Sequence, residues 1–305
     1  MKRYIIRRIG QAIITVIGIS ILTFLLTHIS GDPVALLAPQ NATEADLDEI
    51  RQQHGLDKPI YVQYWKYIKG AVRLDFGGSL RWDRPAFELF VERFPNTIKL
   101  ALVGMSFAIL MGLPTGLFSA VKMGKWFDNF GKVFAFLGQS IPSFWAATML
   151  IIIFAVELRW LPTSGMGNWQ TYLMPAFTLG WYTTAAMVRL SRSSMLDVLD
   201  AEYIKMARIK GVPEFWVILK HAFKNAAAPV ITLTALQFVV MMNGTLIIET
   251  IFNWPGIGRL IVDAIFARDY PIIQMCVLIS SSLFVFTNLF VDILYAYIDP
   301  RIRYR

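Results

Sequence analysis

SRSSMLDVLDAEYIKMARIKGVPEFWVILKHAFKNAAA, from Ser191 to Ala228, is a basic segment that interrupts an otherwise apolar part of the chain. Around Tyr203 its apolar residues recur at helical spacing with charged residues on the opposite side, which predicts an amphipathic helix. Gly211 readily adopts the left-handed conformation that ends a helix, and Pro213 suits the start of the next one. The segment therefore predicts two short helices with a bend between them. Periodicity alone is equally compatible with a helix that lies on anionic lipid.

On either side of this segment the chain is apolar enough to cross a membrane. Of its 305 residues 56% are hydrophobic, and its mean hydropathy is +0.52, which is unlike a soluble domain. The stretches that approach or exceed the roughly 20 residues needed to span a bilayer are 9–26, 98–121, 133–156, 172–188, 226–248 and 272–298. The predicted fold class is therefore an all-α polytopic membrane protein with six transmembrane helices.

Lysine and arginine residues gather on one side of these stretches. Four lie at the N-terminus, three in residues 122–132, seven in 189–224 and three after residue 300, whereas the two short loops on the other side hold three in total. The positive-inside rule then places both termini in the cytoplasm. The predicted organisation is a cytoplasmic end and first span at 1–30, an extracytoplasmic insert at 31–96, and a core domain at 97–305 with five spans and the cytoplasmic loop 189–225.

Two local signals lie near the N-terminus. The apolar stretch 9–26 is longer than the core of a usual signal peptide, and no convincing small-residue cleavage site follows it, so we expect an uncleaved span. Within the insert, Thr43 with Asp46 three residues later predicts the start of a short helix.

Other protein classes are disfavoured by what the sequence contains. The net charge of +8 comes from basic residues without interleaved aromatic residues, which argues against nucleic-acid binding. No Walker A, H-E-x-x-H or G-x-S-x-G motif occurs, and His28, His54 and His221 lie in separate regions. We therefore expect no catalysis, no nucleotide site and no metal site on this chain. The single cysteine, Cys276, has no partner for an intramolecular disulfide.

Polar side chains inside the apolar stretches are candidates for a solute pathway, because an unpaired polar group in hydrocarbon is costly. They are Gln139 and Ser143, which lie on either side of a proline, together with Gln237 and Asn243. Each is compatible with lining a pore or with hydrogen bonding between helices. Asp292 lies near the end of the last stretch, where we expect it to pair locally with a basic group.

The order of residues in the basic segment resembles the EAA cytoplasmic loop of ABC-transporter permeases, in the form found in peptide-type importers. EYIKMARIKG at 202–211 is similar to that family's E-x-Y-x-x-x-A-R-x-K-G pattern, and HAFKN at 221–225 to its H-A-x-[RK]-N continuation. The segment 249–260 is similar to the family signature E-x-x-F-x-x-P-G-x-G-x-L. The resemblance implies the ABC importer type I permease fold.

This resemblance also implies which residues contact other subunits. Coupling to an ATPase is implied for Glu202, Tyr203, Met206, Ala207, Arg208, Lys210, Gly211, Val212, Pro213 and His221. Docking of an extracytoplasmic binding protein is expected at Phe252, Asn253, Trp254, Pro255 and Gly256. Local physics favours an interfacial aromatic belt at the second site equally well, and both interpretations expect exposed aromatic side chains on a stiff turn.

The function that the resemblance implies is that of a transmembrane permease subunit in a binding-protein-dependent ABC importer. The chain would form half of the pathway for dipeptides, oligopeptides or glutathione, with nickel chelates and opines left open. Implied partners are a second permease, two ATP-binding subunits that carry ATP and Mg²⁺, a binding protein and the lipid of a bacterial inner membrane. The alternative is a secondary transporter of small polar solutes, although inverted repeats with paired broken helices are not apparent.

Overall fold

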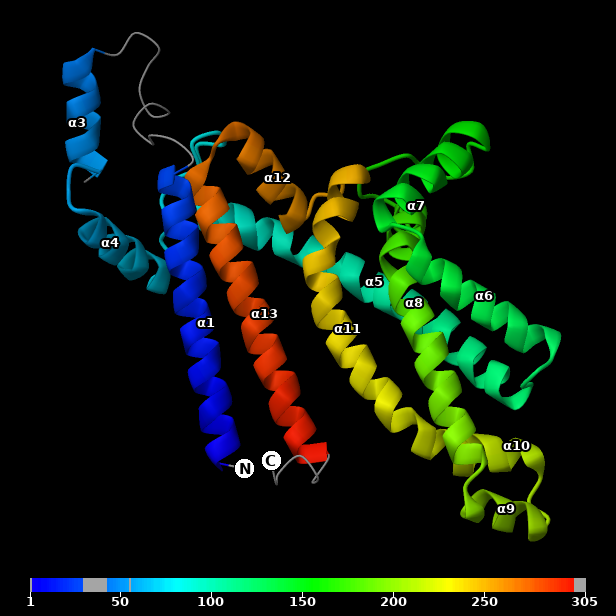
Figure 1. The fold of residues 1–305 in the computed structure, drawn as a ribbon. Coiled ribbons are helices and arrows are strands. Elements are labelled where there is room, and N and C mark those ends of the chain that lie inside the picture. The colour runs from blue at the N-terminus through cyan, green and yellow to red at the C-terminus, as the bar shows by residue number, and fades with distance from the viewer. Residues whose placement is uncertain (1, 30–42, 55, 299–305) are drawn as a thin grey trace. The chain divides into compact units, whose positions relative to one another are not determined.

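The computed structural model describes residues 2–29, 43–54 and 56–298, and this part is helical apart from turns and loops and an isolated β-bridge between Gly78 and Pro85 (Figure 1). Contacts between Cα atoms divide the chain into two compact units. Unit 1 consists of Met1–Asn96 and Pro255–Arg305, and unit 2 of Thr97–Trp254. This grouping differs from the predicted core domain at 97–305, because the segment after Trp254 packs with the N-terminal segment.

The helices are long where the sequence is apolar and short in the polar segments. Unit 1 contains α1 (Lys2–Ile29), α3 (Glu44–His54), α4 (Ile60–Val72), the start of α5 (Ala86–Val121), α12 (Ile257–Ala267) and α13 (Tyr270–Ile298). Unit 2 contains the rest of α5, α6 (Trp126–Ser140), α7 (Ser143–Leu150), the π-helix η1 (Ile151–Glu157), α8 (Gln170–Leu199), α9 (Glu202–Ile209), α10 (Glu214–Trp216), the π-helix η2 (Val217–Ala222) and α11 (Phe223–Ile251).

In unit 1, α1 and α13 run side by side (Figure 1). Arg8 and Asp292 form an ion pair between them at 3.2 Å, which confirms the predicted local pairing of Asp292. The buried Asp269 precedes α13 and accepts hydrogen bonds from the Ser79 hydroxyl and from the Arg81 backbone N–H at 3.2 Å. These contacts attach the segment before α5 to the start of α13.

The N-terminal polar region contributes two helices to unit 1. The Thr43 backbone N–H donates to the Asp46 carboxylate at 2.8 Å, and the N–H of Asp46 donates to the Thr43 hydroxyl at 3.4 Å, so the predicted helix start is confirmed at α3. Tyr64 of α4 hydrogen-bonds Ser20 of α1 at 2.8 Å, and its ring contacts Phe24 edge to face. α4 is thereby fixed to α1 through aromatic contacts.

In unit 2, α5 and α8 approach closely because small residues line their contact. A Cβ atom on Gly180 would lie 2.5 Å from the carbonyl oxygen of Gly104, and one on Gly116 would lie 2.6 Å from that of Val188. Small residues that let helix backbones approach in this way are typical of membrane helix pairs. α8 also packs against α6 and α11 (Figure 1), which makes it the central helix of unit 2.

The predicted spans all lie within helices, with two differences in geometry. The third, 133–156, is broken between α6 and α7, which are bent by 103°. The cause is Pro142, which disfavours the helical conformation at Ile141, where φ is −87° and ψ is 121°. α5 begins at Ala86, so the end of the predicted insert is helical and continuous with the second apolar stretch.

In the part of the chain that the structure describes, fewer helices are long and apolar enough to span a membrane than the six predicted from the sequence. Among the described residues, four helices are long and apolar enough to cross a membrane, and the bent α6–α7 pair is a fifth candidate. α8, which contains the fourth predicted stretch, is not among them. The count of six spans stays a prediction.

Candidate functional site

The basic segment forms two short helices with a turn between them, as predicted. α9 follows the end of α8, and α10 continues through η2 into α11. Gly211 in the turn has a φ of +74°. Its N–H donates to the carbonyl oxygen of Arg208 at 3.0 Å, and the N–H of Val212 donates to that of Ala207 at 3.2 Å. These are the two hydrogen bonds of a Schellman motif, so the predicted left-handed end of the helix is confirmed.

A small apolar core holds α9 in place. Ile204 is 0% exposed and Ala207 is buried, and both belong to one cluster with Met195 of α8, Val217 of η2 and Ala120 of α5. Burying an aliphatic side chain of this size contributes about 1.5–3 kcal/mol. α9 and η2 are therefore packed against residues of α5, α8 and α11 rather than lying free in solvent.

The apolar side of α9 is divided, unlike the single face expected from its periodicity. Ile204 and Ala207 point into the core, whereas Tyr203 and Met206 at the edges of the same arc are exposed, Met206 by 52%. A short helix contacts its support along one narrow stripe, so the flanking apolar residues remain at the surface. The side chain of Ala207 belongs to the protein's own core, and its implied coupling role stays a prediction.

Exposed apolar side chains extend over α9, α10 and η2, and we call them the coupling surface: Met206, Ile209, Phe215, Trp216 and Leu219. Ile209 is 78% exposed, and the rings of Phe215 and Trp216 contact edge to face with centroids 5.4 Å apart. Exposed apolar patches mark contacts with partners or with lipid. Of these five residues only Met206 was among the predicted coupling residues, because the exposure of the others follows from which side of each helix the core occupies.

Polar contacts brace the two helices across the turn. The Arg208 guanidinium donates two hydrogen bonds to the Glu214 carboxylate, at 2.8 and 3.1 Å, and this contact raises the pKa of Arg208. Asn225 Nδ2 donates to the Tyr203 hydroxyl at 2.8 Å and to the carbonyl oxygen of His221 at 3.2 Å. His221 thus joins the site through its backbone. Exposed ion pairs contribute only about 0.2–1 kcal/mol, so these contacts orient the helices more than they stabilise them.

Three of the remaining predicted coupling residues, Glu202, Lys210 and Pro213, are exposed on α9 or in the turn after it. Glu202 is exposed in the first turn of α9 and pairs with Lys205 at 2.8 Å. Lys210 is the exposed residue at the C-terminal end of α9, and Pro213 precedes α10 with a φ of −54°. Val212, by contrast, packs against the apolar core.

A buried ion pair near this site was missed by the sequence reasoning. Asp128 of α6 is 0% exposed and accepts hydrogen bonds from Ser119 of α5 at 2.6 Å and from two nitrogens of Arg192 of α8 at 2.7 and 3.0 Å. Lys132 adds an ion pair at 2.8 Å and the Gly124 N–H a hydrogen bond at 3.0 Å. The network ties three helices together. Only Lys132, four residues along the same helix, could have been anticipated from spacing.

The structure brings together two of the four predicted pathway residues. Gln139 and Ser143 line one hollow of about 270 Å³ at the break between α6 and α7, beside Thr178 and Trp181 of α8. Gln139 also accepts a hydrogen bond from Arg189.

The other two predicted pathway residues lie on α11. Gln237 is half-buried there, outside that hollow. Asn243 lies in the same helix, but its side chain falls outside the described part.

The predicted docking loop differs from expectation in its exposure. Phe252 is 1% exposed and Trp254 0%, so the aromatic side chains are not at the surface. The Trp254 ring packs edge to face on Tyr172 at 4.6 Å, and the Phe252 carbonyl oxygen accepts a hydrogen bond from the Gly165 N–H at 2.8 Å. The aromatic residues are buried where α8 and the loop before it contact this segment.

The rest of the predicted docking loop varies in its exposure. Asn253 is exposed at the turn, Pro255 is half-buried and Gly256 is buried.

Family models match nearly the whole chain. The model described as "Binding-protein-dependent transport system inner membrane component" matches residues 112–304. The N-terminal model of binding-protein-dependent transport system membrane components matches residues 1–101. The first of these includes both the coupling surface and the hollow at the α6–α7 break.

Relatives in sequence align with this protein over its full length and over their own. The glutathione transport system permease protein GsiC of Escherichia coli strain K12 is 44% identical over 306 residues. The protein of the same name from Salmonella paratyphi A is 43% identical over the same length.

Solved structures confirm the fold at low sequence identity. A chain of the inward-facing MetNI methionine ABC transporter has a TM-score of 0.57 at 15% identity and covers 69% of this chain and 96% of its own. A chain of an amino acid ABC transporter with histidines has a TM-score of 0.54 at 15% identity and covers 69% of this chain and 94% of its own. The predicted ABC permease fold is confirmed by this likeness.

Proposed function

The chain belongs to the family of binding-protein-dependent transport system inner membrane components, and on that premise we propose that it forms half of the translocation pathway for dipeptides, oligopeptides or glutathione. It is the permease subunit of an ABC importer, a transport subunit that works with ATPase and other subunits. The single observation that carries the substrate proposal is the full-length similarity to glutathione transport permeases. Family membership also decides against the secondary-transporter alternative.

The proposed complex contains this chain, a second related permease, two ATP-binding subunits and an extracytoplasmic binding protein. ATP would be bound with Mg²⁺ and hydrolysed on the ATP-binding subunits, and no cofactor is proposed for this chain. The proposed location is a bacterial inner membrane with both termini in the cytoplasm. The asymmetry of Lys and Arg residues between the two sides supports this orientation.

In the proposed mechanism the coupling surface docks into a cleft on an ATPase subunit. The exposure of Met206, Ile209 and Phe215 supports this, because closely grouped apolar side chains in a cytoplasmic loop gain free energy when a partner covers them. Movement of the ATPase would displace α9, α10 and η2 as one body, since Ile204 packs in one cluster with Val217 of η2 and the Arg208–Glu214 pair joins α9 to α10.

The displacement then reaches the membrane helices. α10 continues through η2 into α11, and the small core also includes residues of α5 and α8, so each of these helices would tilt with the loop. ATP-driven closure would in this way switch the pathway between inward and outward access. Gln139, Ser143, Gln237 and Asn243 are the proposed polar lining of that pathway.

The loop 252–256 retains a proposed role on the extracytoplasmic side. Asn253 is exposed at the turn of this loop, and it is the proposed contact for the binding protein. Phe252 and Trp254 are proposed to hold the turn in shape from beneath, because their rings are buried.

The substrate proposal is tested with the complete transporter reconstituted in vesicles together with its binding protein. Uptake and ATPase activity are measured with the binding protein loaded with glutathione, a dipeptide, an oligopeptide or a nickel chelate, and empty as the control. We expect stimulation by one of the peptide-like ligands. Stimulation by the nickel chelate alone would refute the proposed substrate class.

The coupling proposal is tested with a matched pair of variants. Phe215→Asp places a charge on the coupling surface, whereas Lys224→Asp places the same residue at an exposed position at the start of α11. We expect Phe215→Asp to release the ATPase subunits during purification and Lys224→Asp to retain them. Equal retention in both variants would contradict docking through the coupling surface.

A further inference from the structure

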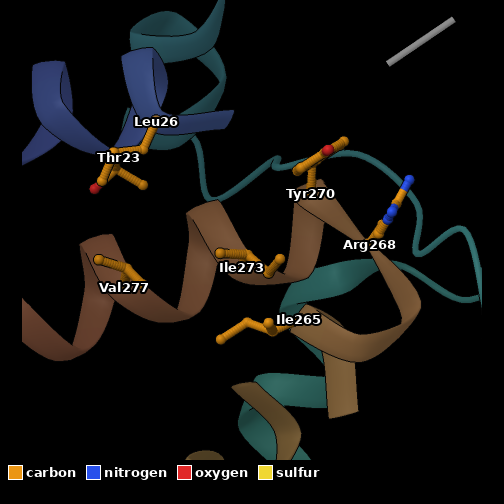
Figure 2. Close-up of a pocket in the computed structure, with 7 residues that line it drawn as sticks. All are labelled: Thr23, Leu26, Ile265, Arg268, Tyr270, Ile273 and Val277. Atoms are coloured by element: carbon orange, nitrogen blue, oxygen red, sulfur yellow. The ribbon is translucent and has the colours of Figure 1, made fainter. Parts of the chain in front are cut away.

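Unit 1 contains a cavity of about 310 Å³ between three helices (Figure 2). Its lining residues are Thr23 and Leu26 of α1, Ile265 of α12, Arg268 just after α12, and Tyr270, Ile273 and Val277 of α13. In Figure 2, Arg268 and Tyr270 lie at one end of the lining, and Thr23 and Val277 at the other. The cavity is therefore charged at one end and mainly apolar along its length.

Arg268 is suited to hold an anion at this cavity. Its backbone has a φ of +53°, which ends α12 and places the side chain beside Tyr270. The guanidinium is exposed and forms no ion pair with any carboxylate in the described part of the chain. Arg259, which lies within α12, is by contrast paired with Asp263 at 3.5 Å. A guanidinium next to an apolar cavity matches a ligand with an anionic head and an apolar tail.

The surroundings of the cavity point to membrane lipid as the source of that ligand. α1 and α13 are both apolar enough to span a bilayer. Yet only 22% of the most apolar 18-residue segment of α1, and 17% of that of α13, is buried in the protein. α12 adds the exposed side chains of Ile265 and Phe266. Because a phospholipid presents acyl chains to such surfaces and a phosphate at the interface, it can satisfy the apolar lining and the cation together.

We propose that this cavity binds a phospholipid, with part of one acyl chain among Ile273, Val277 and Leu26 and with the phosphate paired to Arg268. The cavity volume lies at the lower end of the range for small-molecule pockets, enough for part of a chain but not for a whole lipid. A lipid in this position fills the space between α1 and α13. The proposal depends on the membrane location and not on the transported substrate.

The test is native mass spectrometry of the purified, fully assembled transporter after reconstitution in vesicles of phosphatidylglycerol and phosphatidylethanolamine and extraction in detergent. The wild type is expected to retain phospholipid, and Arg268→Gln to retain about fivefold less, as expected for one basic residue at a lipid surface. Arg268→Lys should restore most of the retention because it keeps the charge. Arg259→Gln removes an equal charge from α12 outside the cavity and should retain lipid as the wild type does.

A second variant tests the apolar part of the site. Val277→Phe fills the cavity and should displace lipid even with Arg268 present. Equal lipid retention in wild type, Arg268→Gln and Val277→Phe overturns the proposal. If Val277→Phe instead releases another transmembrane subunit, the cavity is a subunit interface and the lipid assignment is wrong. Arg268→Gln alters an exposed side chain, so its result stands even if Val277→Phe fails to assemble.

Discussion

Replacement of Gly211 tests whether the bend between α9 and α10 transmits movement from the ATPase. Gly211 has a φ of +74°, and a Cβ atom placed on it would have no atom outside its immediate neighbours within 4 Å. A larger side chain therefore meets open space, and its cost comes from the backbone alone. Gly211→Val and Gly211→Asn form a matched pair, because asparagine tolerates the left-handed conformation and a β-branched residue does not.

The magnitude follows from this geometry. A left-handed conformation costs an ordinary L-residue roughly 1–2 kcal/mol, and a change of that size alters an equilibrium by about 5-fold to 30-fold. Valine at position 211 should therefore lower the population of the bent loop and with it the apparent affinity for the ATPase subunit by a similar factor. The Schellman hydrogen bonds at 3.0 and 3.2 Å should be retained with asparagine.

The assay is purification of the assembled transporter from membranes, followed by ATPase measurement with loaded and with empty binding protein. Gly211→Val is expected to lose ATPase subunits or substrate stimulation, and Gly211→Asn to stay within about threefold of the wild type. Normal stimulation in Gly211→Val would refute the reasoning and favour a helix that lies on the membrane surface. Equal loss in both variants would show that side-chain volume, not backbone conformation, matters at this position.

Three further predictions concern burial and topology. Asp128→Asn disrupts the buried ion pair that ties α6 to α5 and α8, and it should destabilise the purified protein by about 3 kcal/mol in thermal unfolding. Glu202→Gln at an exposed pair should change the midpoint little. Trp254→Ala removes a fully buried ring and should cost about 3–5 kcal/mol, whereas Trp169→Ala removes an exposed one and should be nearly neutral. A single cysteine in place of Trp169 should react with an impermeant thiol label added outside intact cells. One in place of Glu202 should react only after the cells are permeabilised.

Each of these predictions has an outcome that contradicts it. An unchanged unfolding midpoint in Asp128→Asn would show that the ion pair adds no stability. Normal stability of Trp254→Ala together with weaker stimulation by loaded binding protein would return that ring to a docking role. Labelling of a cysteine at position 202 in intact cells would reverse the proposed topology.

Local features of this protein were predictable from neighbouring residues. The left-handed turn at Gly211, the start of α3 at Thr43 and the location of the apolar stretches depend on interactions within a few residues of the chain, and the structure bears them out. The break at Pro142 was visible as a proline in an apolar stretch, but its angle depends on how α6 and α7 pack against α8.

The amino-acid sequence by itself determined the helical class, the membrane character and the residue types in the coupling loop, because periodicity, hydropathy and turn preference are local properties. Only the tertiary structure decided which apolar side chains are buried. Ile204 lies in the core while Met206 on the same helix is exposed, and Trp254 packs on Tyr172 far away in the sequence. The pairing of Asp128 with Arg192 likewise joins residues on different helices. Such contacts are set by how the helices pack, which no short segment of the chain encodes.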